Sequence, residues 1–227
     1  MSLADLTKST SEAMKAKGTV AVSSTIGDET MTGHYDFSAD PVAFSMKTEQ
    51  SGATMDMRFV GGKLYVGGTA VASSLKGKSW MVLDPNDTSN PMSQSLAPLS
   101  KTLTTLSNPN ELLASVGDAE AKVTAVDGTN TTYTIELTAA QVQKLTDDLT
   151  TKMLGSSPTS TASATPEPQK VIETVNGDGL PVKVVMNQPT GGATEDMVTE
   201  YSQWGASFDD LAEPPADQVI SSGDLMP

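Results

Sequence analysis

His34 is the one histidine of the chain, and imidazole is the side chain best suited to proton transfer near neutral pH. Asp36 and Asp40 follow it closely and could orient such a base. However, no serine elbow motif and no second histidine is present to complete a catalytic triad. Residues around His34 alternate between apolar and polar types, and His34 falls on the polar side. We therefore predict that His34 is a solvated surface residue and that the chain has no catalytic residue.

Three other patterns resemble ligand-binding loops. Segments 84–87 and 176–179 are acidic, but neither has the twelve-residue spacing, ending in Glu, of a calcium loop. The glycines at 61–62 lack the spacing of a phosphate-binding loop. Because the chain contains no cysteine, Cys-based zinc sites and disulfides are excluded. We predict turns at these segments, no metal site, no cofactor, and solvated charge at 209–210.

The apolar residues include twelve methionines, whereas aromatic residues make up only 4% of the chain. Methionine is unbranched and soft, so it adapts to irregular apolar neighbours. Ordinary packing of a protein core is the favoured explanation of this composition. A deformable cavity that accepts acyl chains is the alternative, and it stays open here.

The net charge of the chain excludes some classes of binding partner. Its 28 acidic and 14 basic residues give a formal net charge of −14. Such a surface repels phosphate backbones and anionic bilayers, so we expect no nucleic-acid binding and no electrostatic docking to membranes. No segment reaches the roughly 18 consecutive apolar residues of a membrane span. No targeting signal follows Met1 either.

Short alternating segments separated by Gly, Pro, Asn and Asp indicate an antiparallel sheet with one apolar and one polar face. In segment 29–38, for example, Met31 and Tyr35 share one side of the expected strand. A helix over 4–17, ending at Gly18, precedes the first strand. The first six strands are expected as a meander at 19–26, 29–38, 42–49, 54–60, 63–67 and 79–84.

The rest of the chain mixes helices with further strands. Leucines at helical spacing predict helices over 96–106 and 108–116, and a capping box at Thr138 predicts a third helix through Met153. Five more strands are expected at 120–127, 130–137, 170–175, 180–186 and 196–201. We thus predict about eleven strands in a single domain spanning 1–227. Two further segments are expected to be a mobile Ser/Thr/Pro-rich loop at 155–168 and an acidic tail at 204–227.

The order of several segments resembles the LppX/LprAFG family of actinobacterial cell-envelope lipoproteins. The likeness extends from the first helix to Trp204 and the prolines at 214–215. The segments that carry it are GTVAVSSTIGDETMTGHYDF, PVAFSMKTEQSGATMDMRFVGGKLYVGG, GKSWMVLD, NPNELLASVGDAEAKVTAVDGTNTTYTIEL and EDMVTEYSQWGASFDDLAEPPADQVI. The loop at 155–168 is longer than this family needs.

The resemblance implies an α+β fold of the LolA/LolB type. In this fold a strongly curved, half-open antiparallel sheet of about eleven strands wraps helices around a hydrophobic cavity. The resemblance also implies a non-enzymatic function, the carriage of a lipid or lipoglycan by its acyl chains. Assigned by strand face, the cavity-lining residues would be Val20, Val22, Met31, Tyr35, Phe37, Phe44, Met46, Met55, Met57, Phe59, Leu64, Val66, Val184 and Met186.

The same resemblance implies an extracytoplasmic protein held to the cell membrane by a lipidated N-terminal cysteine. This sequence has no cysteine, so we expect the anchor to lie before its first residue. An envelope transporter is a further implied partner. Two alternatives remain: an envelope sensor or regulatory module that binds a protein or peptide on the same sheet, and an enzyme with a cryptic carboxylate site.

Overall fold

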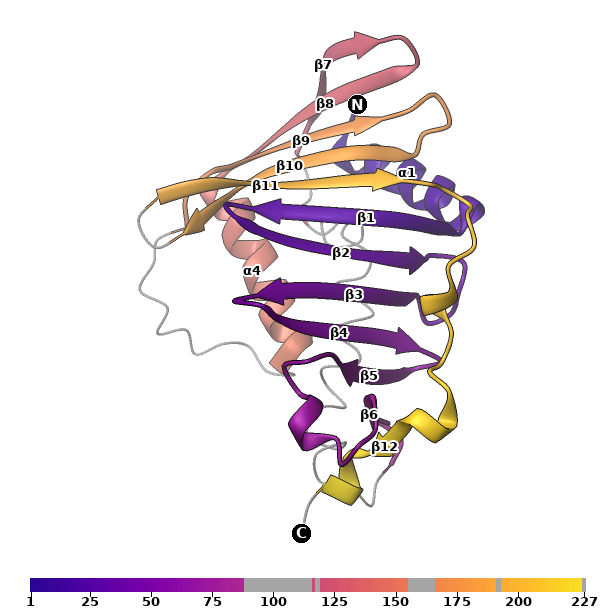
Figure 1. Ribbon diagram of the computed structural model, residues 1–227. Coiled ribbons are helices and arrows are strands. Elements are labelled where there is room, and N and C mark those ends of the chain that lie inside the picture. Colours follow the sequence, from indigo (N-terminus) through magenta and orange to yellow (C-terminus); the bar gives the residue numbers. More distant parts are fainter. Residues whose placement is uncertain (88–115, 117–118, 155–165, 191–192, 226–227) are drawn as a thin grey trace.

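One open sheet dominates the computed structural model (Figure 1). The structure describes residues 1–87, 116, 119–154, 166–190 and 193–225. Twelve strands form the sheet in the order β12-β6-β5-β4-β3-β2-β1-β11-β10-β9-β8-β7. Because this order is linear, β12 and β7 are edges and the sheet does not close into a barrel.

The strand bounds agree closely with the expected segments. In chain order the strands are β1 (Thr19–Ile26), β2 (Glu29–Asp36), β3 (Ala43–Gln50), β4 (Ala53–Val60), β5 (Lys63–Gly67), β6 (Trp80–Leu83), β7 (Ala121–Asp127), β8 (Asn130–Leu137), β9 (Gln169–Val175), β10 (Pro181–Thr190), β11 (Ala193–Ser202) and β12 (Val219–Ser221). Strands β1 to β6 are consecutive neighbours, which confirms the predicted meander. A tight turn at 61–62 joins β4 to β5, and both glycines there have positive φ.

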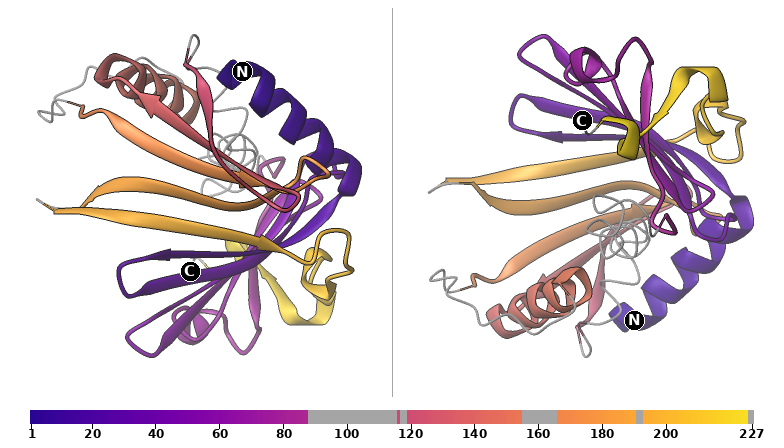
Figure 2. Two further views of the ribbon diagram at one scale, coloured as in Figure 1. Left: turned by 90° about the horizontal axis from the view of Figure 1, so that it is seen from above. Right: turned by 90° about the horizontal axis from the view of Figure 1, so that it is seen from below.

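Helices α1 (Leu3–Lys17) and α4 (Ala139–Leu154) lie on one side of the sheet (Figure 2). The side chain of Ser2 caps α1 by accepting a hydrogen bond from the backbone N–H of Asp5 at 3.0 Å. The predicted capping box of α4 is also present. Thr138 Oγ1 accepts from the N–H of Gln141 at 3.3 Å, and Gln141 Oε1 accepts from the N–H of Thr138 at 2.9 Å.

The pleat separates two unlike faces of the sheet. We call the inner face the one that packs against α1 and α4, and the outer face its opposite. Apolar side chains of the inner face form two buried clusters with the helices. The first joins Leu6 of α1 and Val142 of α4 to Ile135 of β8. The second joins Met14 of α1 to Val20 of β1. Burying each such side chain stabilises the fold by roughly 1.5–3 kcal/mol.

The C-terminal segment, residues 203–225, covers most of the expected acidic tail and forms part of the fold. It runs along the sheet on the side away from the helices (Figures 1 and 2). It contains β12, which pairs in parallel with β6, so the sheet is mixed and has twelve strands instead of about eleven. Four short 3-10 helices complete the described elements: η1 (Ala72–Ser74), η2 (Asp209–Leu211), η3 (Ala216–Gln218) and η4 (Ser222–Leu225).

Some predictions fall outside the described residues. These include the helices expected at 96–106 and 108–116, of which only 116 is described, and positions 155–165 of the expected loop. Side chains in the second half of α4 are also outside the description, so its apolar stripe is seen only through Val142 and Leu145.

Gly33 permits a close approach of β2 to β3. A Cβ atom at this position would collide with the carbonyl oxygen of Ser45. Tyr35, two residues along the same face, donates its phenolic hydrogen to the sulfur of Met46 at 3.7 Å. Met46 is the cross-strand neighbour of Gly33, so the tyrosine covers the region beside the glycine.

We expect Gly33→Ala to lower the free energy of unfolding by about 1–3 kcal/mol, the usual cost of overpacking. The expected loss of stability is opposite to the usual effect of this substitution. Within a strand, replacing glycine by alanine normally stabilises the protein by about 0.5–1 kcal/mol. Urea unfolding of both proteins measures the difference. Thr30→Ala, at an exposed position of the same strand, is the control and should change stability by less than about 0.5 kcal/mol. A stabilised Gly33→Ala variant would contradict this account of the sheet.

Candidate functional site

The strand register places all fourteen predicted lining residues on the inner face. Tyr35 faces Val20 of β1 and Phe44 of β3, and the same row continues to Phe59 and Leu64. A neighbouring row contains Val22, Met46, Met57 and Val66. Met31 and Met55 both face Thr48, while Val184 and Met186 occupy inner positions of β10. Phe37 lies just beyond the end of β2 and packs with the same side chains.

These residues differ in their burial. Val20, Phe37, Phe44 and Phe59 are each at most 6% exposed, and the first two belong to the cluster around Met14. They are therefore packed core residues in this structure. Met55 is 37% exposed and is the most open of the fourteen. The others are half-buried.

The half-buried members form a soft apolar strip across the middle of the sheet. Met46 faces Met57, Met57 faces Val66, and Val66 faces Met81. Methionine side chains have several rotatable bonds, so this strip can adapt to a flexible apolar partner. It is the part of the inner face best suited to contact an acyl chain.

A second inner-face row carries polar groups. It runs from Tyr133 through Glu173 and Val184 to Thr199 and Ser24. The hydroxyls of Thr199 and Ser24 lie 2.9 Å apart and satisfy each other. Glu173 differs from them, because no hydrogen bond or ion pair to its carboxyl group is found within the described part of the chain.

Glu173 is only 2% exposed. Burial raises the pKa of its carboxyl group to about 7. Our sequence reading did not single out this residue. The sequence does indicate that Glu173 is buried. It lies midway between two inward apolar residues, Val171 and Val175, so its side chain must point to the same face.

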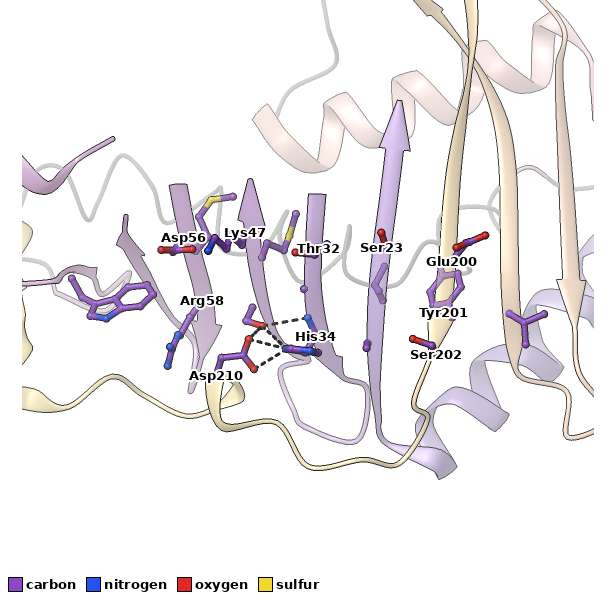
Figure 3. A pocket seen from close by; sticks show the side chains of 18 residues that line it. Ser23, Thr32, His34, Lys47, Asp56, Arg58, Glu200, Tyr201, Ser202 and Asp210 are labelled. Carbon is purple, nitrogen blue, oxygen red and sulfur yellow. Dashed lines mark hydrogen bonds and ion pairs between the residues drawn. The ribbon is translucent and has the colours of Figure 1, made fainter. Parts of the chain in front are cut away.

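A groove of about 660 Å³ lies on the outer face (Figure 3). Its floor is formed by strands β1 to β4, β10 and β11, and the C-terminal segment runs along one side. The polar side chains that line it are Ser23, Thr32, His34, Ser45, Lys47, Asp56, Arg58, Glu200, Ser202 and Asp210. The groove therefore presents both charge signs and many hydrogen-bonding groups.

His34 lies on the polar face of its strand, as predicted, but neither His34 nor Asp210 is the solvated side chain that was expected. Nδ1 of His34 lies 2.8 Å from both carboxylate oxygens of Asp210, and because a carboxylate only accepts, Nδ1 carries the proton. The imidazole also stacks on Phe208, with ring centroids 3.9 Å apart. Ser45 Oγ donates to Asp210 at 2.6 Å. Both residues are only about one-third exposed, so neither is simply solvated charge.

This arrangement is not a catalytic triad. A triad requires the serine to donate to the histidine, with the aspartate on the far side of the imidazole. Here Asp210 lies between the other two and accepts from both. The three side chains instead attach the C-terminal segment to β2 and β3.

Arg58 makes a second attachment of the C-terminal segment. Its guanidinium group lies 4.6 Å from the ring centroid of Trp80 and donates to the carbonyl oxygen of Ala212 at 3.2 Å. Among the described residues, no group of three or more His, Cys, Asp or Glu side chains could hold a metal ion. The groove is thus organised by contacts within the chain.

Comparison with known proteins gives a match at the level of the fold. Neither a family model nor a curated protein sequence matches this chain. The structure is similar to LprF from Mycobacterium bovis, with a TM-score of 0.51 and 11% sequence identity over 93% of this chain and 96% of LprF. The chain has the fold of LprF. It is also similar to the Mycobacterium tuberculosis lipoprotein LppX, with a TM-score of 0.49 and 14% identity over 91% of this chain and 97% of LppX.

The likeness to LprF confirms the resemblance predicted from the sequence, and with it the open, curved α+β sheet. At this level of identity it concerns the fold alone. The identity of any ligand and the lining of any cavity must therefore be argued from the chain's own residues.

We expect Asp210→Asn to lower stability near neutral pH. Burial by itself would raise the pKa of Asp210, but hydrogen bonds from Ser45 and His34 outweigh it and hold that pKa below its usual value. Such a group stabilises the fold above its unfolded pKa of about 3.9, and this contribution is lost as pH falls through the lower folded pKa. The difference between wild type and variant in urea midpoint should therefore shrink below about pH 4.

The matched control is Asp209→Asn, one residue away and exposed. It should leave the urea midpoint unchanged at every pH. Equal effects of the two substitutions would show that the contacts of Asp210 do not stabilise the C-terminal segment.

For Glu173 we expect the opposite dependence of the free energy of unfolding on pH. The folded protein retains its proton up to a pKa of about 7, whereas the unfolded chain loses it near 4.5. Between these values the folded state binds more protons, so the free energy of unfolding falls as pH rises. Glu173→Gln stays neutral and lacks this decline. We expect the variant to gain stability relative to wild type, on the order of 3 kcal/mol, between about pH 4 and about pH 8.

Urea unfolding of the ligand-free proteins across this range measures the effect. Glu136→Gln, at an exposed outer-face position of β8, is the control and should show no such gain. A wild-type profile that runs parallel to that of Glu173→Gln would mean that Glu173 is charged and hydrated in the folded protein.

Proposed function

We propose that this protein is a non-enzymatic carrier that binds the acyl chains of a lipid or lipoglycan on its inner face. The observation that supports this most directly is the half-buried strip of Met46, Met57, Val66 and Met81 on an open sheet. Soft, unbranched side chains suit a partner without a fixed shape. The LprF fold is compatible with this proposal.

Binding of this kind is reversible. Each buried CH₂ group contributes roughly 0.8 kcal/mol of transfer free energy, so one long acyl chain contributes on the order of ten. A bilayer offers nearly the same stabilisation to the chain. The net preference between protein and membrane is therefore small, and exchange needs neither a catalytic residue nor an energy source.

We further propose that the protein acts outside the cytoplasm and is attached to the cell membrane by an N-terminal lipid anchor. No helix among the described residues is long and apolar enough to cross a bilayer. An envelope transporter would donate the lipid to this protein or receive it.

A second candidate function is an envelope sensor or regulatory module that binds a protein or peptide. The outer-face groove of about 660 Å³ favours it, because its mixed charges and hydroxyls suit an extended polar segment. If this is the function, residues of the protein itself would cover the apolar inner face, and no lipid would bind there.

Extraction of the purified protein with organic solvent, followed by mass spectrometry, distinguishes the two functions. Acyl species that copurify in a fixed ratio to protein support the carrier. A preparation without lipid that captures a protein partner supports the regulatory module. A preparation without lipid that also fails to take up lipid from vesicles would contradict the carrier.

Met57→Trp tests where the lipid lies. If the strip contacts lipid, the larger indole occupies the space of the acyl chain, so bound lipid should fall while the free energy of unfolding stays within about 0.5 kcal/mol of wild type. If the strip is solidly packed, the same change should cost about 1–3 kcal/mol. Urea unfolding and quantification of extracted lipid are measured on the same samples.

Thr25→Trp is the matched control, because Thr25 lies on the outer face of β1. It should leave bound lipid unchanged. If both tryptophan variants lose lipid equally, the inner-face strip is not the binding surface.

A further inference from the structure

Glu173 is a buried carboxyl group on the inner face that nothing in the described structure satisfies. It is 2% exposed and has no hydrogen bond or ion pair within the described residues. Native proteins rarely leave a buried polar group unpaired, because the group loses its hydration without compensation. Such an exception calls for a partner, and none is found among the described residues.

The surroundings of Glu173 are apolar apart from tyrosines. One of these is Tyr201 on the inner face of β11, whose pKa is raised by burial, by Tyr35 and by the charge of Glu173. Its direct neighbours across the strands are Tyr133 on β8 and Val184 on β10. Along β9 the neighbouring inward residues are Val171 and Val175, both buried. These residues border the same inner face as the apolar strip of the proposed function.

The positions of the basic residues limit which ligand group could lie beside Glu173. Every lysine and arginine on the described strands points to the outer face: Lys47, Arg58, Lys63, Lys122, Lys170 and Lys183. The strands therefore bring a carboxyl group, but no cation, to the inner face. Above its pKa of about 7 the ionised carboxyl group of Glu173 only accepts hydrogen bonds, so a ligand group beside it must then donate one, and an anionic group would be repelled there.

We infer that Glu173 is a ligand-binding residue that accepts a hydrogen bond from the hydroxyl or amine group of an amphiphile held on the inner face. This inference rests on the proposed function, because the apolar strip is taken to hold the ligand's chain. The carboxyl group then selects among amphiphiles by their polar group. Neutral or cationic amphiphiles with a donor are favoured over acidic ones.

The ionisation of Glu173 is suited to this role. With its pKa raised to about 7 by burial, the carboxyl group is easily deprotonated near neutral pH when a donor or a cation arrives. An amine ligand should release a proton from Glu173 on binding, whereas an alcohol needs only an acceptor oxygen, which either protonation state provides.

Three probes with the same twelve-carbon chain test the inference: dodecylamine, 1-dodecanol and dodecyl methyl ether. The ether accepts hydrogen bonds but donates none. Affinities are measured at about pH 8, where Glu173 is ionised and cannot donate to the ether, through displacement of the apolar dye N-phenyl-1-naphthylamine from the ligand-free protein. We expect wild type to bind the amine and the alcohol at least roughly tenfold more tightly than the ether, as one hydrogen bond to a buried charged group implies.

Two substitutions separate the contributions. Glu173→Leu should bind all three probes equally, with the affinity for the ether unchanged or increased. Glu173→Gln keeps an acceptor oxygen and nearly the same shape, so it should retain the preference for the alcohol and lose that for the amine. The control Glu136→Gln, on the outer face, should behave as wild type.

The outcomes distinguish this inference from the proposed function. If wild type binds all three probes equally and Glu173→Leu changes nothing, the inference fails while the carrier stands. If wild type binds none of them, both fail. Should Glu173→Leu not fold, Glu173→Gln still decides, because an unchanged amine preference in that variant would overturn the role of Glu173.

Discussion

Burial of the inner face is the constraint on which the rest of the structure depends. An open sheet exposes two faces, and only one of them can be covered by α1 and α4. The helices pack mainly with β7 to β10 and with the start of β1. The apolar strip through Met46 and Met57 lies farther along the sheet and is only half-buried. The sheet thus combines a packed half that gives stability with a softer half that suits a removable partner.

The outer face depends on a different kind of contact. There the C-terminal segment is attached by polar groups, through Asp210 to His34 and through Ala212 to Arg58. Such exposed contacts contribute less each than apolar burial does. Together with the pairing of β12 with β6, they still determine where the segment lies and therefore form one side of the groove.

The sequence was sufficient for local features and for the division into faces. Alternation and turn residues predicted β1 to β11, and the capping box at Thr138 predicted the start of α4. Contacts between distant residues could not be predicted in this way. His34 and Asp210 are 176 positions apart, and β12 has only three residues, too few for a periodic pattern. The alternation along β9 was sufficient to predict that Glu173 points to the inner face. Whether a neighbouring strand supplies a partner for its carboxyl group could not be predicted from that pattern.

For a carrier, the apolar strip and Glu173 perform separate tasks. Apolar burial stabilises an acyl chain about equally in a membrane and in a protein. The apolar strip can therefore hold a chain, but it distinguishes poorly between one lipid and another. A single buried acceptor discriminates strongly, because a ligand without a donor leaves it unsatisfied. The same unsatisfied carboxyl group destabilises the empty protein increasingly as pH rises from its unfolded pKa of 4.5 to its folded pKa of about 7. A bound donor relieves that cost, so at neutral pH the loaded state is favoured only for ligands that carry the matching group.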